Sequence, residues 1–126
     1  MKKFIAFVLG LVIMCSVSLA SASVNFQYSG SEKVNFIRWS DSTKSSGKNW
    51  HITWGSNNLS STKRAVVRVY SAPGVYASSL YVYDSASTAY HAYKSGYGQG
   101  KASVYLAGRM DDRDSGVLTV AGQFHN

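Results

Sequence analysis

The chain has 126 residues, of which 13 are Lys or Arg, 6 are Asp or Glu and one is Cys, so its formal net charge is +7. This length predicts one domain, and a single cysteine excludes a fold held by intrachain disulfides. The basic residues are spread along the sequence rather than gathered in a block, which argues against a nucleic-acid-binding protein.

The N-terminal segment has the pattern of a secretory signal peptide. Two lysines follow the first methionine, residues 4–19 are uncharged and largely apolar, and Ala20-Ser21-Ala22 offers the small residues that a signal peptidase accepts. Cys15 lies within the apolar run and would leave with it. We therefore expect a signal peptide at 1–22 and a secreted, extracellular, disulfide-free bacterial domain at 23–126.

Beyond the signal peptide, apolar and polar residues alternate over short runs, and turn residues separate the runs. In the first half of the chain, the runs that predict strands are 24–28, 33–39 and 49–54, with a polar loop at 40–48. In the last of these runs Trp50, Ile52 and Trp54 share one face. We expect that face to enter the core.

In the second half of the chain, the runs that predict strands are 64–70, 75–83, 88–93, 101–106 and 117–124. The clearest alternation is in the first of them, where Ala65, Val67 and Val69 form an apolar row. The stretch 85–94 is the least regular, since its alanines would also tolerate a short helix.

These runs amount to about eight short strands with turn signals roughly every 8 to 12 residues, and no sustained helical period follows the signal peptide. No internal repeat and no linker divides the chain. The sequence therefore predicts an all-β fold. We expect a single-domain antiparallel β-sandwich of immunoglobulin-like or jelly-roll size, with about 7–8 strands.

Four strand-like blocks follow one another along the chain: a Trp-containing block at 49–54, a Tyr-rich block at 89–95, V-x-L-A at 104–107 and T-V-x-G at 119–122. In this order they resemble a family of small secreted proteins of unknown function from Gram-positive bacteria. The resemblance implies a secreted β-sandwich without known catalytic residues, and it carries over no site residue. Neighbouring families include secreted bacteriocins of the lactococcin-972 type, whose glycine-rich, Trp-containing opening this chain lacks.

The sharpest local feature is the acidic segment 111–116, Asp-Asp-Arg-Asp-Ser-Gly. Alternating carboxylates before a glycine are typical of the start of a calcium loop. However, the bidentate Glu that would complete the loop is missing, and Arg113 lies among the would-be ligands. We interpret the segment as a hairpin turn between the last two strands, with calcium binding open as the alternative.

No motif for catalysis, metal binding or a cofactor stands out in the sequence. His51, His91 and His125 are far apart, so a zinc site would need all three to converge with a carboxylate. There is no G-x-S-x-G motif and no Gly-rich phosphate loop followed by Lys-Ser/Thr, and few carboxylates are available for sugar hydrolysis. We therefore expect no metal, no cofactor and no enzymatic activity.

Aromatic residues indicate where a ligand would bind. All nine tyrosines follow the expected signal peptide, and tyrosine offers both a flat ring and a hydroxyl to a ligand. We expect a basic, aromatic surface on the strand faces opposite the apolar rows, made of Arg64, Arg68, Tyr70, Lys101 and Tyr105. The alternative is that the tyrosines only cover the sheet, because they favour strands.

Together these features predict a secreted, non-enzymatic module that binds a cell-wall polymer, a polysaccharide or an anionic membrane surface, and that does not bind nucleic acid. The alternative is a secreted, bacteriocin-like antimicrobial or toxin that acts on the envelopes of other cells. The sequence beyond the signal peptide has no amphipathic helix and no long apolar span, which argues against insertion into a membrane.

Overall fold

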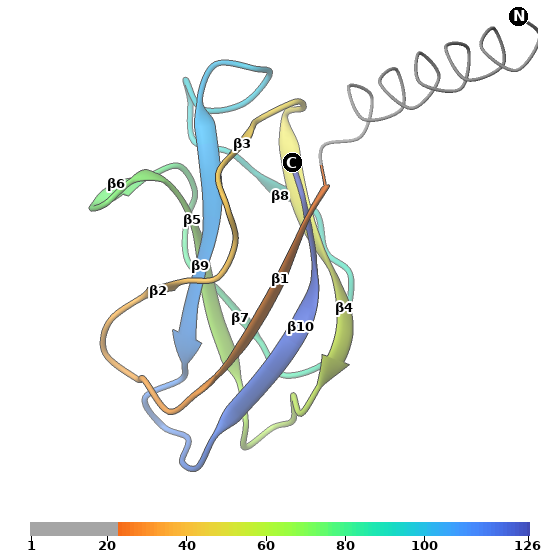
Figure 1. Cartoon of the computed structure of the whole chain (residues 1–126), viewed down its shortest axis with the longest axis vertical. Coiled ribbons are helices and arrows are strands. Elements are labelled where there is room, and N and C mark those ends of the chain that lie inside the picture. The colour runs from red at the N-terminus through yellow and green to blue at the C-terminus, as the bar shows by residue number, and fades with distance from the viewer. Residues whose placement is uncertain (1–22) are drawn as a thin grey trace, which may run out of the picture.

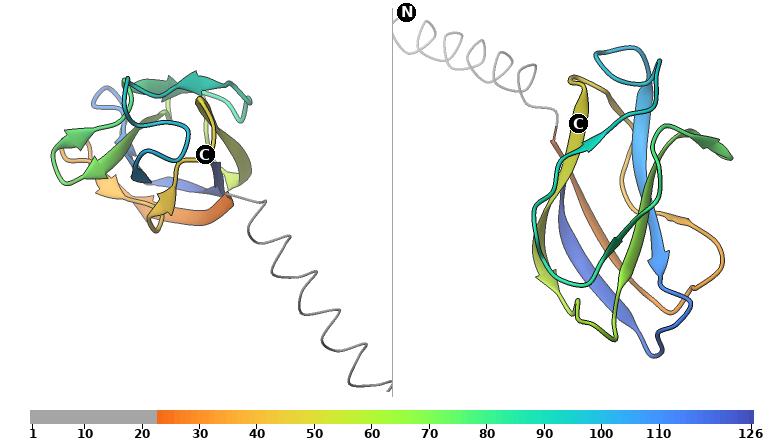
Figure 2. Two further views of the ribbon diagram at one scale, coloured as in Figure 1. Left: turned by 90° about the horizontal axis from the view of Figure 1, so that it is seen from above. Right: turned by 180° about the vertical axis from the view of Figure 1, so that it is seen from behind.

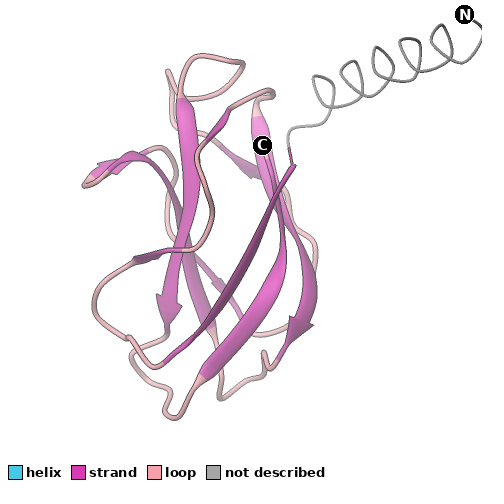
Figure 3. Cartoon of the chain, in the orientation of Figure 1, coloured by secondary structure: helices cyan, strands magenta, loops and turns pink. Residues whose placement is uncertain are grey.

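The computed structural model describes residues 23–126, and the signal peptide expected at 1–22 lies outside the described residues. The described part consists of strands and loops, and it contains no helix (Figures 1 and 3). The strands in chain order are β1 (Ser23–Gly30), β2 (Ile37–Arg38), β3 (Thr43–Lys44), β4 (Asn49–Asn57), β5 (Ala65–Ala72), β6 (Val75–Tyr76), β7 (Tyr81–Tyr83), β8 (His91–Ala92), β9 (Ser103–Met110) and β10 (Leu118–His125).

The strands of the described part form two antiparallel sheets. The four-stranded sheet has the order β1-β10-β4-β8, and the six-stranded sheet has the order β2-β9-β5-β6, with β3 also paired to β9 and β7 to β5. The pairing of β1 with β10 runs from Ser23 opposite His125 to Gly30 opposite Leu118. Seen from above and from behind, the sheets lie around a common interior (Figure 2). The prediction of an all-β antiparallel sandwich is confirmed.

The predicted apolar rows meet between the two sheets. Trp50 and Ile52 of β4 and Phe124 of β10 are fully buried, and so are Val67 and Val69 of β5. All of them belong to one continuous core. Complete burial of a side chain of this size stabilises the fold by about 1.5–3 kcal/mol. The rows that alternation identifies therefore hold the sheets together without a disulfide.

In place of the strand predicted at 33–39, the structure has only the two-residue strand β2. The Glu32 carboxylate accepts hydrogen bonds from the amides of Val34 and Asn35, at 2.9 and 2.8 Å, and so fixes a turn where a strand ladder was expected. Val34 is 79% exposed as a result. The amides of Asn35 and Val34 also hold the pKa of Glu32 below its ordinary value.

Trp39 follows β2 and closes one side of the sandwich. Its ring stacks on Phe26 and on Tyr28 of β1, with centroid separations of 5.7 and 5.2 Å. The indole also lies directly against Gly108 of β9, where any added Cβ would collide with the ring. Glycine at this position therefore allows a close approach of the ring to the backbone.

The runs predicted at 75–83 and 88–93 are strands over short parts only, namely β6, β7 and β8. The Ser78 hydroxyl accepts a hydrogen bond from the Val69 amide at 3.0 Å, so a side chain replaces a backbone partner of β5 there. The stretch 85–94, whose alanines would tolerate a short helix, contains no helix.

The connection between the last two strands crosses from one layer to the other. β9 belongs to the six-stranded sheet and β10 to the four-stranded sheet, so residues 111–117 join different sheets. The prediction of a hairpin turn at this place is therefore wrong. We call residues 111–117 the bridged connection, because the buried carboxylates of Asp111 and Asp114 within it form salt bridges with arginines.

Candidate binding face

The outer side of the six-stranded sheet carries the side chains that alternate with the core rows. Val67 and Val69 of β5 face inward, so Arg68 and Tyr70 face outward. Tyr105 of β9 is the register partner of Tyr70, and it lies on the same outer side. The two tyrosines therefore come together across neighbouring strands.

Tyr70 and Tyr105 form the floor of this outer side. Their rings are stacked, with centroids 5.6 Å apart and planes 11° from parallel, and their exposed fractions are only 8% and 7%. Phe36 packs against Tyr70 at 5.9 Å, and Tyr76 meets the Tyr70 ring edge-on at 5.3 Å. This cluster is separate from the core between the sheets. Burial raises the pKa of Tyr70, so its hydroxyl stays neutral and can donate a hydrogen bond.

Arginines lie over the rings of this cluster. The Arg68 guanidinium is 4.0 Å from the centroid of Tyr76, and the Arg38 guanidinium is 4.4 Å from that of Tyr105. Arg109 approaches Phe36 at 5.2 Å. Rings at these distances hold a cation by cation–π attraction without neutralising its charge. Arg38, Arg68 and Arg109 form no ion pair within residues 23–126, so no carboxylate there neutralises their charges. The guanidinium groups of Arg38 and Arg109 also donate hydrogen bonds to oxygens of the chain.

A groove of about 280 Å³ lies over the tyrosine floor, and its lining includes no Asp or Glu. The turn Pro73-Gly74 borders it, and Gly74 has a φ of 76°, which glycine adopts without strain. This turn carries β6 back along β5, and it places Tyr76 opposite Tyr70. We call the set that lines or covers this groove the aromatic face; its members are Phe36, Arg38, Arg68, Tyr70, Tyr76 and Tyr105.

The structure brings together three of the five residues predicted for the binding surface, which are Arg68, Tyr70 and Tyr105. It places Arg64 immediately before β5, in an ion pair with Asp114, and Lys101 in the loop before β9, away from the groove.

Three members of the aromatic face were not identified from the sequence: Phe36, Arg38 and Tyr76. Phe36 and Arg38 have the alternating spacing of a strand face, which is the one local signal that could have identified them. Tyr76 has no such signal, because its place depends on the turn before β6.

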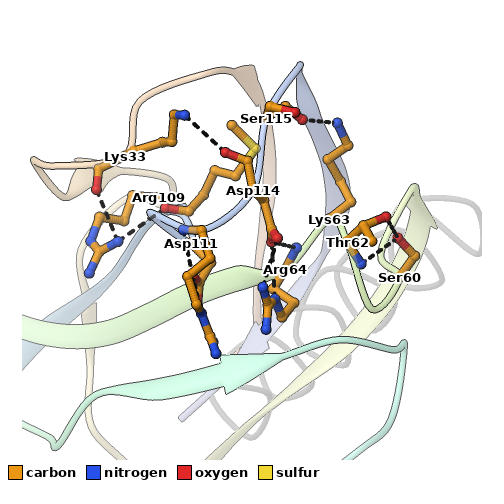
Figure 4. A network of polar contacts seen from close by, with 11 residues as sticks. Lys33, Ser60, Thr62, Lys63, Arg64, Arg109, Asp111, Asp114 and Ser115 are labelled. Atoms are coloured by element: carbon orange, nitrogen blue, oxygen red, sulfur yellow. Dashed lines mark hydrogen bonds and ion pairs between the residues drawn. The ribbon is translucent and has the colours of Figure 1, made fainter.

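The bridged connection carries the acidic segment, and two of its three carboxylates, those of Asp111 and Asp114, are paired with arginines (Figure 4). Asp114 accepts three hydrogen bonds from Arg64, one from the backbone amide at 2.7 Å and two from the guanidinium at 3.1 and 2.8 Å. Asp111 accepts three from Arg113, at 3.0, 2.8 and 2.8 Å. The Arg113 guanidinium lowers the pKa of Asp111, and the Arg64 guanidinium lowers that of Asp114.

Two lysines hold the backbone of the same connection, and Arg109 holds the backbone next to it. The Lys33 ammonium donates to the Asp114 carbonyl at 2.9 Å, and the Lys63 ammonium donates to the Ser115 carbonyl. The Arg109 guanidinium donates to the Lys33 carbonyl at 3.1 Å (Figure 4). With Arg64 and Arg113 as partners, the carboxylate oxygens point toward cations of the chain itself. This arrangement does not suit a calcium loop, the alternative for the acidic segment, because that loop needs free oxygens converging on one ion.

Two of the three histidines meet on the outer side of the four-stranded sheet. His51 and His125 are register partners, and their rings are stacked with centroids 4.3 Å apart. His125 also makes hydrogen bonds to the hydroxyls of Ser23 at 2.6 Å and Thr53 at 2.9 Å. Burial, and then the neighbouring His125, lower the pKa of His51.

The third histidine lies elsewhere, beside the core. His91 makes a hydrogen bond of 2.6 Å to the Tyr83 hydroxyl, and its ring lies 4.8 Å from that of Trp50. Burial lowers the pKa of His91 and raises that of Tyr83 to about 12, so both groups are neutral near pH 7. Within residues 23–126 no three His, Cys, Asp or Glu side chains are grouped so that they could hold a metal ion.

Comparison with known proteins finds no family model that matches the chain, no similar curated protein and no similar solved structure. The resemblance to small secreted proteins of Gram-positive bacteria therefore stays a prediction, and so does the extracellular location. The part of the chain that the structure describes contains no helix long and apolar enough to cross a membrane.

Proposed function

We propose that the chain is a secreted, non-enzymatic binding domain for anionic polysaccharides of the cell envelope. The observation that carries this proposal is the aromatic face, where Arg38 and Arg68 are held against tyrosine rings beside an open groove.

The chemistry of the groove matches such a polymer. A flat aromatic ring offers contact area for the apolar face of a sugar, and a tyrosine hydroxyl adds a hydrogen bond. A guanidinium binds a carboxylate or phosphate through two parallel hydrogen bonds. Arg68 is already positioned by the Tyr76 ring, so binding costs little side-chain entropy.

A polymer fits the face better than a membrane does. The three most exposed aliphatic side chains, Val34, Val82 and Val117, lie on different segments, and none of them lines the groove. Of the exposed large apolar residues only Tyr76 is part of the groove lining, while Ile37 and Val75 flank lining residues in the sequence. In contrast, the rings and cations of the aromatic face are gathered in one groove of about 280 Å³.

The proposal is tested by cosedimentation of the purified protein with cell walls that carry their anionic polymers and with walls stripped of them. We expect binding to the complete walls only, and about tenfold weaker binding for the double variant Arg68→Gln/Tyr76→Ala, because each lost contact contributes roughly 0.5–1 kcal/mol. Tyr90→Ala is the matched control, since Tyr90 is 68% exposed and packs against His51 of the four-stranded sheet.

Three outcomes would contradict the proposal. The protein could fail to sediment with either kind of wall, or the double variant could bind as tightly as the unaltered protein while keeping its thermal unfolding midpoint. Alternatively, the protein could release dye from anionic liposomes at the concentrations used for walls. That result would favour action on membranes, as expected of an antimicrobial or toxin.

A further inference from the structure

A second pocket, of about 370 Å³, is lined by residues at or just before the starts of β4 and β9. Figure 1 shows that both strands begin at the end of the sandwich opposite the bridged connection. Its lining includes Lys48, Lys94 and Lys101, together with the loop between β8 and β9. The Gln99 amide of this loop donates to the Gly47 carbonyl at 2.8 Å, which ties the loop to the residues before β4. We call this pocket the lysine pocket, and a backbone hydrogen bond of the chain itself holds its wall in place.

The positive charge of the lysine pocket is not neutralised within the described residues. No Asp or Glu lines the pocket, and both ion pairs found in residues 23–126 belong to the bridged connection. Three other lining residues, Ser95, Gly96 and Gly98, have backbone amides that donate no hydrogen bond in the described part of the chain. Three exposed lysine ammonium groups and three amides thus have no acceptor within residues 23–126.

Lys94 joins the lysine pocket to the aromatic face. Its side chain lines the pocket, and its ammonium lies 5.6 Å from the ring centroid of Tyr76. The Lys94 amide donates to the Ala77 carbonyl at 2.9 Å, so its backbone is fixed beside the end of β6. A linear ligand that lies over Tyr76 would therefore reach the pocket past Lys94.

We propose that the lysine pocket is a phosphate subsite and that the chain binds a linear polymer whose repeating units carry phosphate groups, with sugar or polyol parts on the aromatic face. Phosphate suits the pocket because its several acceptor oxygens can take hydrogen bonds from more donors than the two oxygens of a carboxylate can. The identity of the polymer rests on the proposed function, whereas the subsite can be tested by itself.

The subsite is tested by nuclear magnetic resonance titration of the purified protein with glycerol 1-phosphate, against sodium chloride at equal ionic strength. We expect the largest amide shifts in the loop between β8 and β9 and at Lys48. Lys101→Gln should weaken this binding roughly two- to fivefold, as the loss of one exposed ion pair does. Lys44→Gln is the matched control, because Lys44 is exposed and belongs to β3, which pairs with the start of β9, but does not line the pocket.

Polymer length provides the second measurement. Affinity for polyglycerol phosphate should rise with chain length until one molecule reaches both the pocket and the aromatic face, because the second contact is then intramolecular. Lys94→Gln should weaken the binding of long chains more than that of glycerol 1-phosphate. A carboxylate polymer such as polygalacturonate should not shift the loop amides.

The outcomes separate the subsite from the proposed function. Absence of loop shifts with glycerol 1-phosphate, or equal shifts with polygalacturonate, would overturn the phosphate subsite. The subsite would also be wrong if wall binding required Arg68 but was unchanged in Lys48→Gln/Lys101→Gln. Loop shifts that Lys101→Gln weakens, found in a protein that does not sediment with walls, would support the subsite and refute the proposed function.

Discussion

The two ends of the sandwich are both rich in cations, yet they use them in opposite ways. At the bridged connection, Arg64 and Arg113 are paired with buried carboxylates, and Lys33 and Lys63 donate to carbonyl oxygens. At the lysine pocket, no lining residue is acidic. The first set of charges is used within the fold, whereas the second is left for a ligand.

The contrast shows that the number of cations alone does not locate a binding surface. A cation whose hydrogen bonds are completed by the chain contributes to stability, and its removal leaves a buried partner unsatisfied. A cation without such a partner contributes little to stability, and its electric field acts on solvent and ligands instead. Removing charges at each end should therefore have opposite consequences for stability and for binding.

The largest effect on stability is expected from Asp114→Ala. This change removes the acceptor of three hydrogen bonds from Arg64, whose side chain is 19% exposed, and it should lower the free energy of unfolding by about 2–3 kcal/mol. Urea unfolding measures the loss. Asp112→Ala in the same connection is the control and should change stability by less than about 0.5 kcal/mol, since Asp112 is exposed. Equal losses in both variants would show that the pairing does not matter.

A smaller effect is expected from acid. The pKa values of Asp111 and Asp114 in the folded chain lie below their ordinary values, so the unfolded chain takes up these protons first as the pH falls. The stabilisation is complete above about pH 4, the usual value for Asp, and it is lost as the pH falls through the lower folded values.

Urea unfolding from about pH 5 down to about pH 2 tests this expectation. The free energy of unfolding should fall less steeply in Asp111→Asn than in the unaltered protein, because one of the three carboxyl groups with a lowered pKa, those of Glu32, Asp111 and Asp114, is gone. An unchanged slope in this variant would place the acid sensitivity elsewhere in the chain. Asp112→Asn serves as the control.

The smallest effect on stability is expected at the lysine pocket. Lys48→Gln/Lys101→Gln should leave the free energy of unfolding within about 0.5 kcal/mol of its original value, because neither side chain forms an ion pair in the described residues and mutual repulsion is relieved. The measurement is the same urea unfolding. A loss comparable to that of Asp114→Ala would mean that the lysines are part of the fold, and the contrast between the ends would fail.

The core was predictable from the sequence, because it depends on local alternation. Trp50, Ile52 and Val67 are buried as the pattern requires. The pattern failed where a side chain competes with the ladder, as Glu32 does by accepting the amides of Val34 and Asn35. It also failed for the connection between β9 and β10, because alternation does not reveal which sheet a strand joins.

The candidate site was predictable only in part, for a related reason. Arg68 and Tyr70 share a strand face, so alternation places them together. Arg64 has the same spacing, but its partner Asp114 lies 50 residues away in sequence, and only the folded chain shows the pair. Tyr76 joins the site through the register of β6 with β5, which the sequence does not specify.

The place of β10 has a consequence for how the chain folds. β10 lies between β1 and β4, so the last strand of the sequence joins the first strand to the rest of its sheet. A chain that becomes available from its N-terminus cannot complete this sheet until residues 118–125 are present, and pairing over such sequence distances is slow. This strand order therefore delays completion of the four-stranded sheet until β10 is available to pair with both neighbours.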